Sequence, residues 1–179
     1  MILLPSQSFP YIVSSVEVSG WQIVSADIQR IFNVEIVESP FIYREKIFDD
    51  IEIEQWFLSR VQSGGLILSC SRKDNQKLVG FASYGPFRSF PGSVGTVEHS
   101  IYVDRSQRGQ GIGSVLLHEI TMAAQKSGRK ALVGVIDSEN LGSLHMHDQA
   151  DFARVGCMKS LGYKWGAYRD AWFVQKVLA

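Results

Sequence analysis

The chain has 179 residues, of which 45% are hydrophobic and 20% charged, so it can bury one substantial core and we expect a single domain over residues 1–179. Lysine plus arginine equals aspartate plus glutamate at 18 each, which excludes an overall field that would draw the protein to nucleic acid or to a membrane. No apolar run reaches membrane-spanning length, and the opening MILLPSQSFP lacks the basic start of a secretory leader and is interrupted by Pro5 and Pro10, so we expect a cytoplasmic protein.

Two helices are predicted in the first third of the chain. Asp27 is a typical capping residue, and the apolar residues after it have near-helical spacing until Ser39, so we expect a first helix from about Asp27. Asp49 and Glu52 have the spacing of a capping box, and the apolar face that follows them ends at Gly64. The second helix is therefore expected between Asp49 and Gly64.

Strands and helices alternate in the rest of the chain. Two short apolar runs flank a polar turn and predict a hairpin, and a third strand leads into a long amphipathic helix that ends at Gly128. The strand after that helix completes a βαβ unit. The expected ranges are strands at 66–70, 78–84 and 95–103, a helix at about 112–128, a strand at 131–136, a short helix near 143–150 and a last strand near 171–177.

Cysteine and histidine give no sign of a disulfide framework or of a metal site. Cys70 and Cys157 lie far apart in the sequence, and we interpret both as buried apolar side chains. His145 and His147 lie two residues apart on an expected helix, so they point to different faces, and no third ligand follows at a suitable spacing. We therefore expect no bound metal.

A glycine-rich turn, VDRSQRGQGIGSVLL at 103–117, joins the third strand to the long helix. Gly109, Gly111 and Gly113 let the backbone turn tightly and aim amide groups at one point, where the start of the helix adds its positive dipole end. A Walker loop is excluded because no Gly-Lys-Ser/Thr triplet occurs, and Ser114 breaks a dinucleotide fingerprint. The turn predicts a pyrophosphate site, with a plain flexible loop as the alternative.

The turn also resembles the signature of the GNAT superfamily of N-acetyltransferases, which is arginine or glutamine, two residues, glycine, one residue, then glycine or alanine. Arg108, Gly111 and Gly113 match it. Within that superfamily the chain is more similar to the phosphinothricin, methionine sulfone and methionine sulfoximine acetyltransferases, because further segments match in order between about 23 and 175. They are IFN at 31–33, FASYGPFR at 81–88, TVEHSIYV at 96–103, NLGSLHMH at 140–147, and the pattern Gly162, Lys164, Asp170 and Gln175.

The resemblance implies an α/β (α+β) fold with a mixed, mostly antiparallel central sheet, a splayed central strand pair and helices on both faces. It further implies acetyl-CoA as the co-substrate, a small-molecule amine as the acceptor, and a homodimer to which the C-terminal segment contributes. The backbone at 101–103 is expected to hold the acetyl carbonyl and the pantetheine, which Asn140 and Ser143 also approach. The implied cofactor-binding residues are Ile101, Tyr102, Val103, Arg108, Gly109, Gln110, Gly111, Ile112, Gly113, Ser114, Asn140 and Ser143.

Such a reaction needs a base, because an amine at neutral pH is mostly ammonium and cannot attack a thioester. Glu98 suits this role. It shares one face of the third strand with Ser100 and Tyr102, and burial there is expected to raise its pKa toward the useful range. The alternative is a structural glutamate in a salt bridge or hydrogen bond. On the opposite face we interpret His99 as a hydrogen-bonded core histidine, with a catalytic role as the alternative.

His147 is the second expected catalytic residue. It lies seven residues past Asn140, where the resemblance implies a group that hydrogen-bonds the CoA sulfur or protonates it. Thiol pKa values lie near about 8.5, so a thiolate is already a fair leaving group and an acid is expected to help only modestly.

The acceptor site is predicted from three residues. Arg88 is expected to pair with an anionic group such as a carboxylate, unless it is an ordinary solvated arginine, and Phe41 and Tyr84 are expected in the pocket wall, though each also suits the core. The chain departs from the family pattern around this site, for example at Gly92 and Gly95, so the pocket is expected to be reshaped. The predicted activity is acetylation of a small primary amine by direct attack. A non-catalytic CoA-binding module and an acetyltransferase of protein amines remain the alternatives.

Overall fold

One seven-stranded sheet and four α-helices make up the part of the chain that the computed structural model describes, residues 9–178. The strands lie in the order β1-β2-β3-β4-β5-β7-β6, and every neighbouring pair is antiparallel except β4 with β5. The mixed, mostly antiparallel sheet is therefore confirmed. The elements are β1 (Tyr11–Ser15), α1 (Trp21–Glu38), α2 (Asp50–Gln62), β2 (Leu66–Arg72), β3 (Leu78–Pro86), β4 (Thr96–Val103), α3 (Ile112–Lys126), β5 (Ala131–Asp137), α4 (Leu141–Gln149), β6 (Ala153–Lys164) and β7 (Ala167–Val177), with 3-10 turns at Val18–Gly20, Pro91–Ser93 and Arg105–Gln107.

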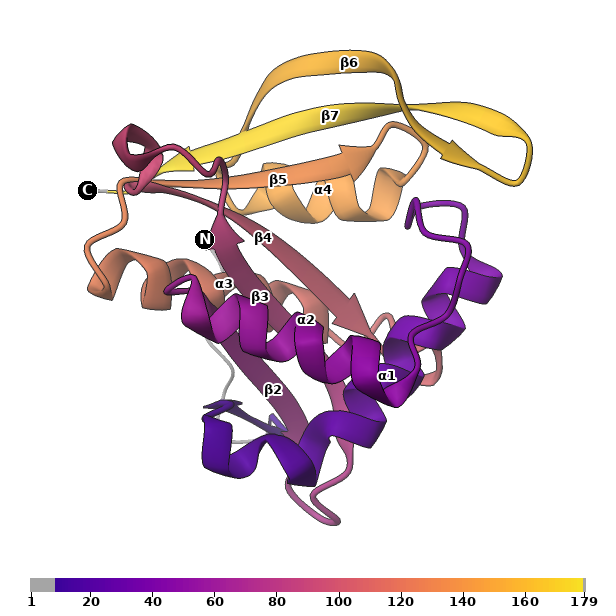
Figure 1. Cartoon of the computed structure of the whole chain (residues 1–179), viewed down its shortest axis with the longest axis vertical. Helices are drawn as coiled ribbons and strands as arrows, with labels where there is room; N and C mark the ends of the chain where they lie inside the picture. Colours follow the sequence, from indigo (N-terminus) through magenta and orange to yellow (C-terminus); the bar gives the residue numbers. More distant parts are fainter. Residues whose placement is uncertain (1–8, 179) are drawn as a thin grey trace.

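The two central strands, β4 and β5, are paired over a short distance and then separate. Residues 96–98 lie opposite residues 131–133. Beyond them β4 continues along β3 to Val103, while β5 pairs with β7 as far as Asp137. Figure 1 shows the two strands diverging from the end at which they are paired. Backbone groups that face such a gap lack a neighbouring strand, so an extended ligand can satisfy them.

Helices cover both faces of the sheet, and the alternation of side chains along β4 divides the core in two. Val97 and Ile101 belong to the core beneath α3 and α4. Tyr102 instead packs against Phe32 of α1 on the opposite face, with ring centroids 4.5 Å apart. Glu98 shares the face of Tyr102 because side chains alternate with a period of two. The splayed strand pair and the helices on both faces, implied by the resemblance, are thus present.

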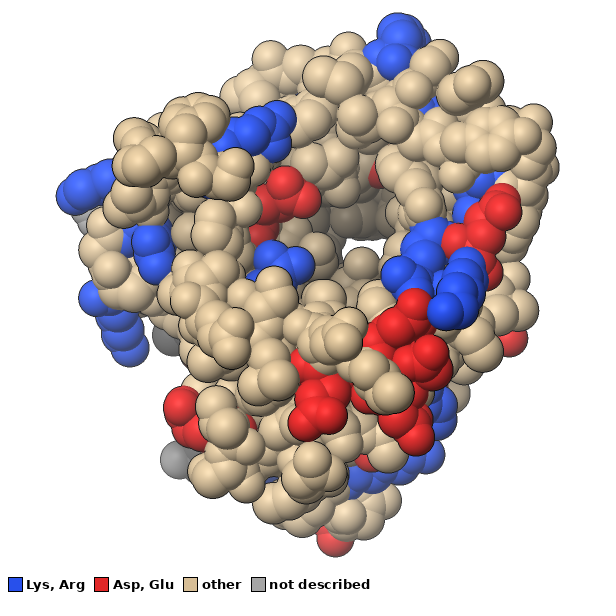
Figure 2. Space-filling view, viewed as in Figure 1, with Lys and Arg blue, Asp and Glu red and all other residues tan. Residues whose placement is uncertain are grey.

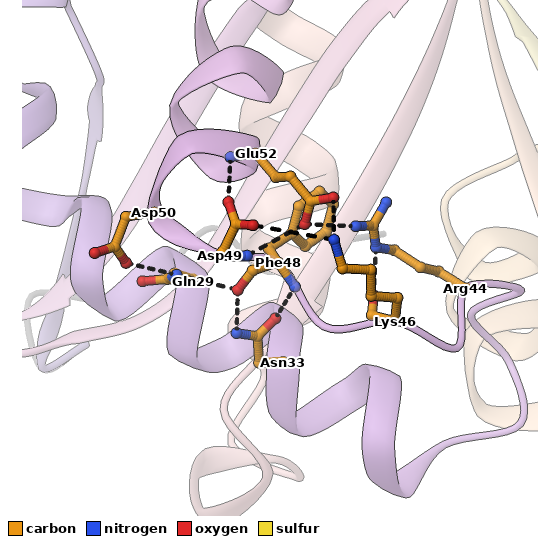
Figure 3. Close-up of polar contacts among 8 residues, drawn as sticks. All are labelled: Gln29, Asn33, Arg44, Lys46, Phe48, Asp49, Asp50 and Glu52. Atoms are coloured by element: carbon orange, nitrogen blue, oxygen red, sulfur yellow. Dashed lines mark hydrogen bonds and ion pairs between the residues drawn. The ribbon is translucent and has the colours of Figure 1, made fainter.

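The segment between α1 and α2 is held by polar side chains (Figure 3). The side chain of Asn33 accepts a hydrogen bond from the amide of Phe48 (2.8 Å) and donates one to its carbonyl (2.9 Å), so it pairs with this backbone as a strand would. Asp49 and Glu52 form the predicted capping box of α2. Arg44 donates to Glu52 and its guanidinium lies 4.0 Å from the centre of the Phe48 ring. These contacts fix the course of the segment.

Helix α1 begins earlier than the sequence predicts. It starts at Trp21, after a 3-10 turn and without a side-chain cap. Asp27, the predicted cap, lies inside the helix and pairs with Arg30 (3.1 Å). An acidic residue that suits a cap also suits an i,i+3 ion pair, and the local pattern does not distinguish the two. The end of α3 is as predicted, because Gly128 follows it with φ of +78°.

Two strands, β1 and β6, are missing from the sequence prediction, and β7 begins at Ala167 instead of near 171. Most side chains of β6 are exposed, and its pairing with β7 shifts register twice, so it has no clean apolar alternation. Cys157 lies in this strand and is half-buried, which corrects the expectation that both cysteines are buried; Cys70 is buried.

Lys164, at the end of β6, connects the β6–β7 hairpin to α1. Its ammonium donates hydrogen bonds to the carbonyls of Ile36 (2.7 Å) and Arg44, and the residue is 2% exposed. A cation is favoured at this position because Ile36 lies in the last turn of α1, where the helix dipole is negative.

Residues 1–8, including Pro5 of the opening segment, lie outside the described residues. Within residues 9–178, no helix is both long enough and apolar enough to span a bilayer.

Candidate active site

The glycine-rich turn joins β4 to α3. Gly109 and Gly111 have φ of +77° and +80°, and Gly111 is the N-cap of α3 without a side-chain hydrogen bond. A Cβ atom added at either position would meet nothing within 4 Å, so the requirement for glycine is conformational and not steric. The amides of the first turn of α3 carry no side-chain cap and, with the helix dipole, suit an anionic group.

A cavity of about 560 Å³ extends from this turn along the gap between β4 and β5. Its volume is typical of small-molecule sites. Figure 2 shows that the face toward the viewer is hollowed in the middle, with acidic and basic side chains in the wall. Every predicted cofactor-binding residue except Gln110 lines the cavity: Ile101, Tyr102, Val103, Arg108, Gly109, Gly111, Ile112, Gly113, Ser114, Asn140 and Ser143.

Two residues of the turn contact distant parts of the chain. Arg108 donates a hydrogen bond to Glu35 of α1 (2.5 Å) and approaches the carbonyl of Val103 (3.4 Å). Gln110 accepts a hydrogen bond from the hydroxyl of Tyr11 in β1 (2.5 Å). Glu35 also lines the cavity, so a carboxylate stands beside the arginine that is predicted to bind pyrophosphate. Sequence analysis misses Glu35, because only packing brings α1 to the turn.

The far wall of the cavity comes from the start of α4. Asn140 caps this helix by accepting a hydrogen bond from the amide of Ser143 (3.1 Å), and α4 therefore begins at Leu141, two residues before the predicted start. A Cβ atom at Gly113 would lie 3.0 Å from the sulfur of Met146. The third glycine of the turn thus leaves room for Met146 where α3 packs on α4.

His99 and His147 form a buried pair that lines the same cavity. Their Nε2 atoms lie 2.9 Å apart, and the two residues are 5% and 3% exposed. Nδ1 of His99 lies 2.8 Å from the carbonyl of Val133, and Nδ1 of His147 lies 2.8 Å from that of Ser143. Burial lowers the pKa of both rings, and the neighbouring His147 ring lowers that of His99 further. His99 is a hydrogen-bonded core histidine, as predicted, but its partner was not foreseen.

Glu98 lies where β4 and β5 separate, on the face opposite the two histidines. It is the last residue of β4 that pairs with β5, and its side chain is half-buried. Within residues 9–178 its carboxylate forms neither an ion pair nor a hydrogen bond, so a structural salt bridge is not supported. Burial raises the pKa of Glu98, while the cations Arg60 and Arg88 limit the rise. Arg60 reaches this place from α2 by packing over Gly85, the residue opposite Glu98 in β3.

Tyr84 is a core residue, which corrects the prediction that it lines the acceptor pocket. It lies opposite His99 in the β3–β4 ladder and is 3% exposed in the core beneath α3. Its hydroxyl shares a hydrogen bond with that of Ser127 (3.1 Å). Strand alternation therefore directs the ring to the face away from Glu98.

The other two predicted acceptor residues lie apart. Phe41 lines the cavity. Arg88 is exposed in the loop after β3, where its guanidinium lies 4.0 Å from the centre of the Phe87 ring. Among residues 9–178, Arg88 is linked to the site only by its effect on the pKa of Glu98.

A buried ion pair that sequence analysis misses borders the cavity. The carboxylate of Asp137, in the cavity wall, accepts two hydrogen bonds from Arg169 (2.6 and 2.9 Å) and one from the hydroxyl of Tyr43 (3.0 Å). Burial acts to raise the pKa of Asp137, but the hydrogen bonds from Arg169 and from the Glu139 amide outweigh it and lower the pKa below its ordinary value. The pair joins β5 to β7, and Tyr43 links both to the segment after α1.

His145 is exposed while His147 is buried, so the two side chains point apart. Across residues 9–178, no group of three His, Cys, Asp or Glu side chains is arranged to hold a metal ion.

Known proteins resemble this chain in sequence and in structure. The model of the acetyltransferase (GNAT) family matches residues 28–152. The L-methionine sulfoximine/L-methionine sulfone acetyltransferase of Pseudomonas paraeruginosa is 36% identical over 148 residues, 83% of this chain and 86% of the relative. The L-amino acid N-acyltransferase of Escherichia coli is 33% identical over 150 residues, 84% and 86%. A putative acetyltransferase of Salmonella typhimurium, solved with acetyl-CoA, has a TM-score of 0.86 at 28% identity over 94% of each chain.

Proposed function

This chain belongs to the acetyltransferase (GNAT) family, and from that premise we propose that it acetylates the primary amine of an amino acid or amino-acid analogue, with Glu98 as the general base. The chain is an acetyl-CoA-dependent N-acetyltransferase. The acceptor class is inferred from relatives that act on methionine sulfone, methionine sulfoximine or L-amino acids, and phosphinothricin belongs to the same class.

The cavity fits acetyl-CoA, which supplies the acetyl group as a thioester. Uncapped amides at the start of α3, together with Arg108, suit the pyrophosphate. The gap between β4 and β5 suits the extended pantetheine, with the backbone of residues 101–103 on one side and Asn140 and Ser143 on the other. The side chain of Gln110 is bound to Tyr11, so this residue can contribute to the set only through its backbone.

One observation carries the assignment of the base: Glu98 is a half-buried carboxylate without a hydrogen-bonded partner among residues 9–178, at the point where β4 and β5 part. Burial raises its pKa, so it holds an abstracted proton more readily than an exposed glutamate. Glu98 takes the proton of the ammonium, and the neutral amine attacks from its side of the sheet. His147, on the other side, faces the departing sulfur.

The cations near Glu98 favour an amino acid as the acceptor. Arg60 and Arg88 both act on the Glu98 carboxylate, yet neither is ion-paired in the described part of the chain. An acceptor that presents its ammonium to Glu98 can offer its carboxylate to these guanidinium groups. Amines without an acidic group are expected to be poor substrates.

A panel of amines with labelled acetyl-CoA tests the proposal. Amino acids, their sulfone and sulfoximine analogues and phosphinothricin should be acetylated, while polyamines and peptides should not. Glu98→Gln should lower kcat/KM by roughly 10²–10⁴-fold and leave CoA binding by calorimetry unchanged. CoA binding without transfer to any amine would favour a non-catalytic module, and preferred acetylation of peptides would favour a protein acceptor.

We extend the proposal to a homodimer in the cytoplasm, formed through the β6–β7 hairpin. This hairpin exposes apolar and aromatic side chains, and the upper part of Figure 2, where Figure 1 draws β6 and β7, is mostly uncharged. A contiguous exposed apolar surface favours association. The exposed residues are Val155, Met158, Leu161, Tyr163, Trp165 and Tyr168.

A further inference from the structure

We infer that His99 and His147 share one proton between their Nε2 atoms, and that this pair, instead of His147 alone, is the acid that protonates the departing sulfur of CoA. The shared proton is inferred only from the positions of the two imidazole rings and of their hydrogen-bond partners. The catalytic part rests on the proposed function and makes His99 a positioning residue that acts through His147.

Hydrogen-bond counting sets the number of protons. Each Nδ1 lies 2.8 Å from a backbone carbonyl, of Val133 for His99 and of Ser143 for His147. A carbonyl only accepts, so each Nδ1 must carry a hydrogen. The two Nε2 atoms are 2.9 Å apart, a distance that holds one proton but not two. The two rings therefore carry three protons on four nitrogens, and the pair has a charge of +1.

Burial limits the pair to this one charge. Burial lowers the pKa of both rings and so opposes even the first positive charge on the pair, while the charge of His147 lowers the pKa of His99 further and opposes a second. Losing the shared proton is also unfavourable, because two lone pairs would then face each other at hydrogen-bond distance. We expect the contact between the two lone pairs to cost more than the burial of one charge, so that the pair keeps its three protons and its single positive charge at neutral pH.

The charged groups on the surrounding elements are already paired, so none forms an ion pair with the histidines, although the charge of Asp148 favours the protonated form of His147. The pairs are Asp148 of α4 with Arg154, Asp137 of β5 with Arg169, and Lys176 of β7 with the carbonyl of Ala150. Both rings pack against Phe152, and His99 also lies beside Gly134; both neighbours are uncharged.

Gly134 shows that β5 leaves room for this arrangement. A Cβ atom at Gly134 would lie 3.0 Å from Cε1 of His99 and 3.0 Å from Val174. Any larger residue would crowd both the His99 ring and Val174. The neighbouring positions in β5, Val133 and Val135, carry the branched side chains that a strand favours. The glycine is therefore explained by the space that the His99 ring occupies.

The proposed step balances as one proton transfer. When the C–S bond breaks, its electron pair goes to sulfur. The contact between the two Nε2 atoms opens, the shared proton stays on Nε2 of His147 and passes to that sulfur, an S–H bond forms, and both rings are left neutral. Water in the cavity returns a proton to the pair before the next turnover, while the protons of the amine leave by way of Glu98 on the opposite face.

Nitrogen NMR of the imidazole rings in the full chain without CoA tests the shared proton. The chain has four histidines, so exposed His145 and half-buried His118 serve as internal references. At pH 7 both Nδ1 atoms of the pair should be protonated, the Nε2 signals should lie between those of protonated and bare nitrogen, and both rings should titrate together. A bare Nδ1 in either ring, neutral rings at pH 7, or independent titration of the two rings would overturn the inference.

Kinetics tests whether the pair acts as a unit. His99→Gln and His147→Gln should each lower kcat about tenfold, and the double variant should also lose only about tenfold. The alkaline limb of the kcat profile, where the pair loses its proton, should vanish in both single variants. His145→Gln, on the same helix but exposed, should change nothing. Losses that multiply, or an unchanged alkaline limb in His99→Gln, would overturn the catalytic part. Absence of transfer to any amine would instead refute the proposed function, and the NMR result would stand.

Discussion

Glu98 and His99 are neighbours in the chain, yet their side chains serve opposite faces of β4. The alternation places Glu98 with Tyr102 beside α1, and His99 with His147 beneath α4. Under the proposed mechanism, a reaction in the gap between β4 and β5 would therefore be reached by a base from one face and by an acid from the other. The two proton transfers do not compete for one group.

Arg60 is expected to lower the pKa of Glu98, the proposed base. As the proposed base, Glu98 must be ionised in the free enzyme, so kcat/KM should fall as the pH drops through the Glu98 pKa, which burial raises and Arg60 partly lowers. In Arg60→Met the lowering contribution is lost, and the acid limb of kcat/KM should move to higher pH. Arg88→Met, which removes the exposed second cation, should move it less. A limb that stays in place in Arg60→Met would show that Glu98 is not the group that titrates.

Gly111 is expected to be sensitive to a single methyl group although nothing crowds it. Its φ of +80° is unfavourable for alanine by about 1–2 kcal/mol, and relief of the strain would turn the first amides of α3 away from the pyrophosphate. Gly111→Ala should lower the free energy of unfolding by about 1 kcal/mol in urea titrations and raise the Kd for CoA about tenfold in calorimetry. The matched control is Gly92→Ala, which has open space and no positive φ. Equal effects at both positions would contradict this account.

Some site residues could be predicted from the sequence because their signals are local. The three glycines and Arg108 lie within six residues of one another, and Glu98 follows from strand alternation and the need for a base. Arg60, Glu35 and the Asp137–Arg169 pair could not be predicted, since helix packing or strand order brings them to the site from 32 or more residues away along the chain. Tyr84 was misplaced because an aromatic residue beside a motif suits a core and a pocket wall equally well.

At the scale of elements, the β6–β7 hairpin and the segment after α1 form one edge of the site. Lys164 binds the carbonyls of Ile36 and Arg44, and Tyr43 binds Asp137, so both contacts join the hairpin side of the sheet to this segment. Each contact uses a buried polar group, and each would leave an unpaired partner if it were removed.

Lys164 is expected to contribute more to the free energy of unfolding than an exposed lysine does. Lys164→Met keeps the length of the side chain but leaves two carbonyls without their donor, which should lower the free energy of unfolding by about 2–3 kcal/mol. Lys159→Met on the same strand removes an exposed pair with Asp170 and should cost less than about 1 kcal/mol. Urea titration of both variants measures the difference. Similar losses in the two would mean that the carbonyls are satisfied in another way.

Elements with strong local signals were predicted, and those that depend on their neighbours were not. The capping box of α2 and the amphipathic face of α3 with Gly128 set their own boundaries. β1 is an edge strand of five residues, and β6 has an exposed outer edge and positive φ at Ser160. Both exist because a neighbouring strand pairs with them, and neither carries a periodic pattern strong enough to be recognised alone.

For the whole molecule we predict a dimer. Light scattering should give twice the chain mass of 20.0 kDa at micromolar concentration. Tyr168→Asp places a charge on the exposed face of the hairpin, where Tyr168 is 73% exposed, and should yield the single-chain mass. Ile23→Asp, at an 85% exposed position on α1, should leave the dimer intact. A single-chain mass in the unaltered protein would refute the dimer. Dissociation by Ile23→Asp would show that the interface does not lie at the hairpin.

The short ladder between β4 and β5 also divides the chain into two consecutive parts. A cut in the turn after Gly128 leaves β1 to β4 with α1 to α3 in one piece, and β5 to β7 with α4 in the other. Across that boundary the sheet is continuous only where residues 96–98 meet residues 131–133. Reassembly of the two fragments would thus depend on side-chain packing and on a ligand bound across the gap between β4 and β5. The cleaved enzyme would therefore reassemble more readily when acetyl-CoA is present.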